Sequence, residues 1–250
     1  MNLSAPIRKP EAISSFEQLD AHLREWTLKF ASEERQFPML IDAVTLGKAE
    51  YANAFPHLVM GASVAAEAEA PFDDKNAALT KWFLSPAICY HAFAEFSGRV
   101  LEREVIITAR GHCFRNEAAN ELIPGRRQVE FQMRELVFMG TESRISERLS
   151  ECQMEVAGLA EAVGLDCTWC PASDPFFLPR ARGKAIMQRM LGTKLELCLP
   201  CGLAIASINR HGTFLAERFG ISLSDGSAAY TACVAFGLDR WAAHVSAASR

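Results

Sequence analysis

Apolar side chains recur at helical spacing in three parts of the chain. The first repeat consists of Phe16, Leu19, Leu23, Trp26 and Phe30. Because these positions are three or four residues apart, they predict an amphipathic helix over residues 13–35. A longer helix is predicted over residues 141–163, with Thr141 as its N-cap and Gly164 as its stop. A final helix is predicted over residues 241–248.

Shorter runs of β-branched and aromatic residues predict strands. These runs cover residues 105–108, 128–139, 204–209 and 230–236. The apolar segment around Pro86 fits either a helix or a strand–helix junction. The Pro124-Gly125 pair predicts a loop over residues 118–127. The strands are arranged as hairpins, without regular crossover helices, so the pattern predicts an α+β fold with an antiparallel sheet.

Composition and charge narrow the range of functions. The 250 residues are 50% hydrophobic and 22% charged, which is typical of a globular protein. A net charge of -4 argues against a protein that wraps a polyanion. No segment approaches the roughly 20 apolar residues of a membrane span, and the N-terminus lacks the apolar core of a signal peptide. We therefore expect a cytoplasmic protein in which the eight cysteines are mostly reduced.

Arginine, glutamate and phenylalanine are combined in a pattern that suits a nucleotide. Arg115 and Glu117 are two residues apart at the end of a predicted strand, which places them on one face. The following loop carries Arg126 and Arg127, and the return strand carries Phe131. Guanidinium groups bind phosphate oxygens, a carboxylate accepts from an amino group, and a ring can stack on a base. The alternative is a surface hairpin with a salt bridge between Arg115 and Glu117.

These residues resemble two motifs of the class II aminoacyl-tRNA synthetases. Residues 111–117 with 126–135 resemble motif 2, and residues 236–244 resemble motif 3. The resemblance implies ATP as a substrate, bound by Arg115, Glu117, Arg126, Arg127, Phe131 and Arg240. By this resemblance Arg115 holds the α-phosphate, and Arg240 holds the γ-phosphate and one adenine face. Motif 1 would lie around residues 52–62, with Pro56 as its proline.

The cysteines allow two metal sites. Cys167, Cys170, Cys198 and Cys201 form two C-x-x-C pairs, which are typical of a zinc ribbon, although such cysteines are more often small buried hydrophobic residues. Alternatively, Cys89, Glu135 and Cys233 occupy positions similar to the zinc ligands of methanogenic-type seryl-tRNA synthetases. That resemblance implies a catalytic Zn2+, because three ligands leave one position open for the substrate's amino group.

Residues 109–117, 194–200 and 231–241 further resemble the amino acid:[carrier protein] ligases, which are truncated relatives of those synthetases. This resemblance implies one catalytic domain over residues 1–250, with residues 1–35 as a helical extension. It implies a homodimer that activates glycine or alanine as an adenylate and transfers it to the phosphopantetheine thiol of a carrier protein. No tRNA is expected. Two alternatives stay open: a tRNA-charging core that needs a separate tRNA-binding partner, and a catalytically silent regulatory homologue.

Two departures from the family pattern concern the ATP site. The acidic residue that helps to hold Mg2+ before the late strand is absent near Leu203, and Glu196 is the nearest substitute. Motif 3 has Asp239 where glutamate is common.

The neighbouring strand carries candidate pocket residues. Ser207 and Asn209, with His211, match the strand that lines the amino acid pocket in the family. The alternative is that His211-Gly212 is only a turn at the end of a strand.

A basic stretch precedes the late strands. It contains Arg180, Arg182, Lys184, Arg189 and Lys194, with no acidic residue among them. It is either a solvated helix face or a docking site for an acidic carrier protein.

Overall fold

A seven-stranded sheet forms the centre of the molecule. The computed structural model describes residues 8–67, 69, 73, 75–172 and 193–248. The strand order is β1-β6-β7-β12-β10-β9-β8. The strands are β1 (Glu33–Arg35), β6 (Val105–Phe114), β7 (Glu130–Gly140), β8 (Thr168–Pro171), β9 (Lys194–Cys198), β10 (Ala204–Gly212) and β12 (Tyr230–Gly237). All neighbours are antiparallel except β1 and β6, which are parallel. The predicted α+β fold with a mainly antiparallel sheet is confirmed.

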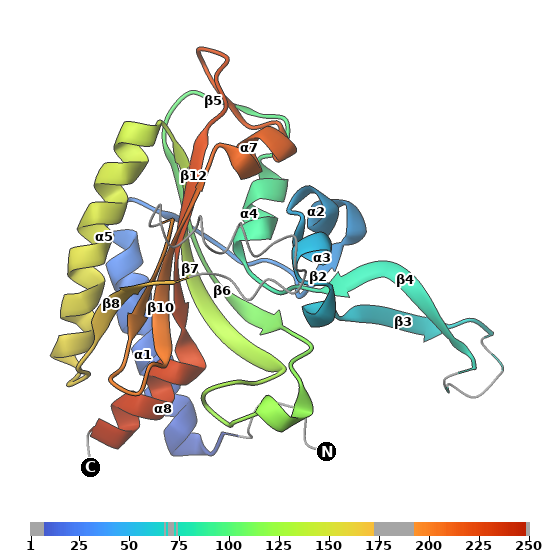
Figure 1. The fold of residues 1–250 in the computed structure, drawn as a ribbon, viewed down its shortest axis with the longest axis horizontal. Helices are drawn as coiled ribbons and strands as arrows, with labels where there is room; N and C mark the ends of the chain where they lie inside the picture. The colour runs from blue at the N-terminus through green and yellow to red at the C-terminus, as the bar shows by residue number, and fades with distance from the viewer. Residues whose placement is uncertain (1–7, 68, 70–72, 74, 173–192, 249–250) are drawn as a thin grey trace.

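Three long helices cover one face of this sheet (Figure 1). They are α1 (Pro10–Leu28), α5 (Glu142–Ala162) and α8 (Leu238–Ala248). The apolar stripe of α1 is buried, and Phe16 and Trp26 lie in the same core as Phe138 and Phe236 of the sheet. Burying these side chains is the main force that holds the helices on the sheet.

Short elements cover the opposite face. They are α2 (Ala43–Lys48), α3 (Tyr51–Ala54), α4 (Cys89–Glu95), α7 (Phe214–Phe219) and the 3-10 turns η1 (Pro56–Leu58) and η2 (Ala119–Glu121). A second core lies between them and the sheet, with Phe93 and Phe219 fully buried.

Two small sheets complete the structure. One contains β2 (Leu40–Asp42), β4 (Ala77–Leu84) and β3 (Gly61–Ala65), and its β3–β4 hairpin projects from the body (Figure 1). The other pairs β5 (Val100–Leu101) with β11 (Ser222–Leu223). Among the described helices, none is long and apolar enough to cross a membrane.

Several predicted boundaries agree with the structure and others need correction. The helix predicted over 141–163 is α5, with Thr141 at its N-cap. The helix predicted over 13–35 is wrong at its end, because Ala31 has a φ of 56° and the chain then pairs with β6 as strand β1. The segment near Pro86 is a strand–helix junction between β4 and α4. Residues 52–62 form α3, η1 and the start of β3, outside the large sheet.

The structure describes only the last basic residue of the predicted basic stretch. Arg180, Arg182, Lys184 and Arg189 lie outside the described residues. Lys194 begins β9, and its Nζ lies 3.2 Å from Glu196 Oε1.

Candidate active site

A cleft of about 1450 Å3 lies on the sheet face that carries α4 and α7. The strands β6, β7, β12 and β10 contribute to it, together with the loop between β6 and β7. Every site residue predicted from the sequence lines this cleft: Cys89, Arg115, Glu117, Arg126, Arg127, Phe131, Glu135, Glu196, Ser207, Asn209, Cys233 and Arg240.

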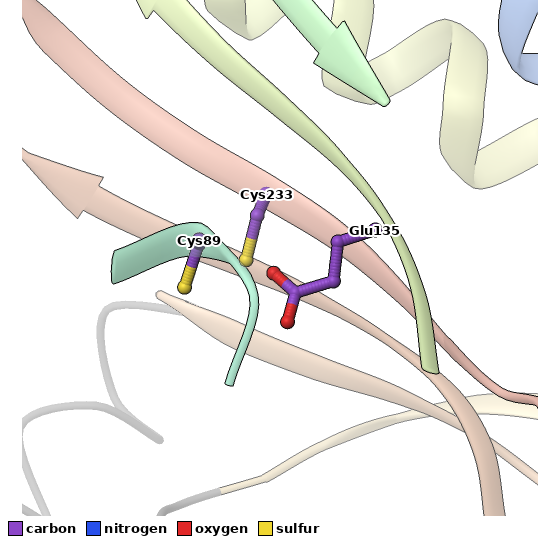
Figure 2. A group of neighbouring side chains, drawn as sticks. All are labelled: Cys89, Glu135 and Cys233. Atoms are coloured by element: carbon purple, nitrogen blue, oxygen red, sulfur yellow. The ribbon is translucent and has the colours of Figure 1, made fainter. Parts of the chain in front are cut away.

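Cys89, Glu135 and Cys233 converge at one place in the cleft (Figure 2). One ligand atom from each lies within 4.8 Å of the others. Cys89 is the first residue of α4, whereas Glu135 and Cys233 come from the neighbouring strands β7 and β12. Glu135 pairs with Ala235, two residues from Cys233, so both side chains point to the same sheet face. Cys89 is 5% exposed, Glu135 is 1% exposed and Cys233 is 3% exposed.

This group is electrostatically unfavourable without a cation. Glu135 Oε1 accepts a hydrogen bond from the Ile88 backbone N–H at 3.0 Å, but its Oε2 is buried without a hydrogen-bond partner among the described residues. Burial, and then the neighbouring Cys233, raise the pKa of Glu135 to about 8. A hydrogen bond to Cys233 and burial raise the pKa of the Cys89 thiol, while the same hydrogen bond lowers the pKa of Cys233. A divalent cation would reverse these penalties, and two thiolates with one carboxylate suit Zn2+.

The zinc ribbon predicted as an alternative is not formed. Among the residues that the structure describes, Cys167, Cys170, Cys198 and Cys201 do not form a group that could hold a metal ion. Cys201 Sγ instead lies 3.7 Å from Arg126 Nη2. Cys170 and Cys201 are exposed, so these two are not buried core residues either.

The other end of the cleft carries arginines. The Arg115 guanidinium lies 5.0 Å from the centre of the Phe131 ring, and its Nη2 donates to Pro86 O at 3.3 Å. The alternative salt bridge between Arg115 and Glu117 is not the one observed, because Glu117 pairs with Arg127 at 3.2 Å. In the part of the chain that the structure describes, the Arg115 Nε is buried and has no hydrogen-bond partner. A nucleotide phosphate could satisfy that donor.

Arg240 is held above this region by backbone carbonyls. Its Nε donates to Arg126 O and its Nη1 to Ala204 O, both at 2.8 Å. Burial, and then the nearby Arg115, lower the pKa of Arg240. Concentrated positive charge of this kind favours a polyanionic ligand.

Asp239 and Glu196, the two residues involved in the departures from the family pattern, both lie at the cleft. Asp239 accepts from the Gln132 backbone N–H at 2.6 Å and pairs with Arg8, so it fixes the start of α8 at the edge of the cleft. Glu196 lies across from Ser207 in the β9–β10 pair, inside the cleft.

The pocket residues of β10 are linked to the three converging side chains. Asn209 Nδ2 lies 3.2 Å from Ser207 Oγ and 3.5 Å from Cys233 Sγ. Strand β10 continues through His211 to Gly212, so His211 is not merely a turn residue. No sequence signal pointed to the Ile88 N–H, since any non-proline residue could donate there. None pointed to Tyr90 either, which also lines the cleft.

Two curated relatives match most of the chain. No protein-family model matches it. "Amino acid--[acyl-carrier-protein] ligase 1" of Bradyrhizobium diazoefficiens is 29% identical over 233 residues, which is 84% of this chain and 70% of the relative. Ligase 2 of the same organism is 30% identical, over 84% of this chain and 68% of the relative. A type-2 serine–tRNA ligase of Methanococcus maripaludis is 30% identical over 45% of this chain and 24% of its own length.

Solved structures of tRNA synthetases share the fold. The seryl-tRNA synthetase of M. kandleri, solved with an A. aeolicus tRNA, has a TM-score of 0.79 at 18% identity, over 98% of this chain and 54% of that one. The Giardia lamblia prolyl-tRNA synthetase, in complex with prolyl-adenylate, has a TM-score of 0.71 at 16% identity, over 97% and 47%. At these identities the likeness concerns the fold, which is that of class II synthetases.

Proposed function

The chain belongs to the amino acid--[acyl-carrier-protein] ligase family, and we propose that it activates a small amino acid, glycine or alanine, as an aminoacyl-adenylate for transfer to the phosphopantetheine thiol of a carrier protein. One observation supports this above all. A set of three potential metal ligands and a set of arginines that suit phosphate groups line the same cleft. An amino acid and ATP bound there would meet between them.

Cys89, Glu135 and Cys233 are the residues that would hold Zn2+. Bound there, zinc would act as a Lewis acid with one open position for an α-amino group, which excludes molecules that lack one. Ser207 and Asn209 would align the substrate beside these ligands. Large side chains of Tyr90, His211 and Phe214 also line the cleft, which supports a substrate with a small side chain.

The arginine end would bind ATP. Arg115 would hold the α-phosphate, Phe131 and Glu117 the adenine, and Arg126 or Arg127 the outer phosphates. Arg240 would bind the γ-phosphate and the other face of the adenine. Glu196 is the residue of this chain that would take the place of the missing Mg2+ carboxylate.

Positioning would supply most of the rate enhancement in both steps. The amino acid carboxylate attacks the α-phosphorus in line, the bond to the β-phosphate oxygen breaks, and pyrophosphate leaves. Arg115 and Arg240 stabilise the charge that develops on the phosphoryl oxygens. The pantetheine thiol then gives its proton to solvent and attacks the adenylate carbonyl, the bond between that carbonyl and the phosphate oxygen breaks, and AMP leaves as the thioester forms.

We expect the protein to act in the cytoplasm as a homodimer. Its acceptor would be a carrier protein, and it would not charge tRNA. The whole chain would act as one catalytic domain, because α1 is packed into the same core as the sheet that carries the cleft.

Amino-acid-dependent exchange between pyrophosphate and ATP tests the first step. Zinc-loaded protein is incubated with each of the twenty amino acids, and exchange is expected with glycine or alanine. The second step is tested with a radiolabelled amino acid and a purified carrier protein in its phosphopantetheinylated form. The unmodified carrier is the matched control, because it lacks the thiol.

The same two assays distinguish the tRNA-charging core and the silent homologue from a carrier-protein ligase. Label on bulk tRNA, and none on the carrier, would identify a tRNA-charging core. A protein that contains zinc but exchanges with no amino acid would be a silent homologue, and the proposal would be wrong.

A further inference from the structure

His211 lies beside Cys233 on the cleft face of β10. Its Nε2 is 3.8 Å from Cys233 Sγ. Asn209, two residues earlier on the same strand, places its Nδ2 3.5 Å from the same sulfur. Cys233 therefore has two nitrogen atoms within hydrogen-bond distance, both from one strand.

Packing fixes the direction of the imidazole ring. The ring meets Phe93 edge to face, with 5.6 Å between the ring centres and an interplanar angle of 90°. Phe93 is fully buried and belongs to α4, the helix that begins with Cys89. The ring thus lies between the elements that carry the two cysteines, and its Nε2 faces the sulfur of one of them.

The chemistry of a thiolate selects one form of this ring. A metal-bound cysteine sulfur carries no proton and can only accept hydrogen bonds. His211 Nε2 must then carry the hydrogen of this bond. Nδ1 is buried without a hydrogen-bond partner within the described part of the chain, so it does not compete for the orientation of the ring.

The two cysteines have different surroundings. Cys233 has the nitrogen atoms of His211 and Asn209 beside its sulfur, whereas Cys89 hydrogen-bonds to Cys233 and to Glu135. A hydrogen bond to a thiolate withdraws charge that the sulfur would otherwise give to a metal, and it orients the lone pairs. The two sulfurs would therefore be unequal ligands.

We propose that His211 is a positioning residue of the metal centre, which holds and polarises the Cys233 sulfur through an Nε2–H···S hydrogen bond. This inference rests on the proposed function, because it requires a metal held by Cys89, Glu135 and Cys233. The hydrogen bonds from His211 and Asn209 make Cys233 the weaker charge donor. The centre then stays electrophilic toward an amino group in its open position.

The test uses cobalt(II) in place of zinc, because thiolate-to-cobalt charge transfer gives an absorption band that reports the energy of the sulfur lone pairs. His211→Phe keeps a ring against Phe93 but removes the N–H. We expect this variant to bind cobalt with the band shifted to longer wavelength. Its zinc affinity, measured by chelator competition, should fall by about ten- to a hundredfold. His211→Gln retains an N–H donor and should restore most of both properties.

Two controls keep the test decisive. His112→Phe makes the same exchange on β6, where His112 pairs with Glu130 at 2.7 Å outside the cleft, and should change neither readout. Should His211→Phe fail to fold, Asn209→Ala removes the second donor and should shift the band in the same direction. An unchanged band and an unchanged zinc affinity in a folded His211→Phe protein would show that His211 only packs.

Metal binding by the unaltered protein separates a failure of the proposed function from a failure of this inference. If the unaltered protein binds neither zinc nor cobalt, the metal centre is wrong and the inference falls with it. If the unaltered protein binds metal and the variants alone show no effect, only the role of His211 is overturned.

Discussion

At the scale of single residues, the cleft combines one buried carboxyl group and two buried thiols at one end with arginines at the other. Glu135 Oε2 and Arg115 Nε are both buried polar atoms that find no hydrogen-bond partner within residues 8–172 and 193–248 as far as these are described. Such groups cost free energy in the folded protein unless a ligand satisfies them. Each end of the cleft therefore gives a separate prediction about binding.

Replacing a cysteine of the converging group should remove the metal. We expect Cys89→Ser and Cys233→Ser to lose most of the roughly one zinc ion per chain that a single site holds. A serine hydroxyl is a much weaker ligand for zinc than a thiolate. Metal content after dialysis measures this, with Cys170→Ser on β8 as the matched control. Zinc lost from the Cys170 variant and kept by the other two would favour the C-x-x-C pairs instead.

Removing Arg115 should impair adenylate formation and leave the metal in place. We expect Arg115→Ala to slow pyrophosphate exchange by about a hundredfold or more, as removal of one charge-stabilising donor does in other enzymes. The control is Arg144→Ala, an exposed residue of α5 that pairs with Glu147 at 2.8 Å. Exchange within about threefold of the unaltered protein would contradict a role of Arg115 at the α-phosphate.

At the scale of elements, helix α1 is tied to the strand that carries Glu135. Arg134 of β7 donates to both carboxylate oxygens of Asp20 on α1, at 2.7 and 2.8 Å. Arg134 is 2% exposed. Because alternate residues of a strand point to opposite faces, Arg134 meets the helix while Glu135 faces the cleft. The helix thus helps to set the position of a proposed metal ligand on the far side of the sheet.

Breaking this buried ion pair should destabilise the protein. We expect Asp20→Ala to lower the free energy of unfolding by about 3 kcal/mol or more, since it leaves the Arg134 charge buried without its main partner. Urea denaturation measures the change, and Glu25→Ala at an exposed position of the same helix is the control. The double variant Asp20→Leu/Arg134→Met should recover much of the loss. A loss below about 1 kcal/mol in Asp20→Ala would mean that the pair is not effectively buried.

At the scale of the whole molecule, carboxylates join the N-terminal helix α1 to two strands of the sheet. Hydrogen bonding with Arg110 lowers the pKa of Glu17, and hydrogen bonding with Arg24 lowers the pKa of Glu34. Arg110 lies on β6 and Arg24 on α1, so Glu17 ties α1 to β6 and Glu34 ties β1 to α1. A group with a lowered folded pKa stabilises the protein above its unfolded pKa, and this stability is lost as the pH falls through the folded value.

Stability should therefore decline in acid partly through these two groups. We expect Glu17→Gln/Glu34→Gln to be less stable than the unaltered protein near pH 7, with the difference shrinking as the pH falls below 4.5 and through the lowered folded pKa values. The effect should be at most about 1 kcal/mol, since both carboxylates are solvent-accessible. Unfolding free energies at several pH values measure it, with Glu161→Gln, an exposed residue of α5, as control. An equal difference at pH 3 and pH 7 would show that the carboxylate charges are not responsible.

Helices and strands that are marked by a side-chain period or by capping residues within a few positions could be predicted from the sequence alone. Helix α5 begins after Thr141 and ends before Gly164, as its apolar period and its flanking residues predict. The strands near Ile107, Val137, Ile208 and Val234 follow from short buried runs of apolar residues. Strands β8 and β9 were not predicted, because they are only four and five residues long. Their pairing depends on neighbours that no local pattern reveals.

Tertiary structure decided the rest. Phe30 continues the helical period of α1, yet the helix ends at Leu28, because residues 33–35 pair with β6 far along the chain. Neighbouring cysteines in C-x-x-C pairs do not form a metal site, whereas Cys89, Glu135 and Cys233 do converge. Only the family resemblance linked those three residues beforehand. Side-chain period and turn chemistry act over a few residues, while strand order and register bring distant residues together and so decide which side chains meet.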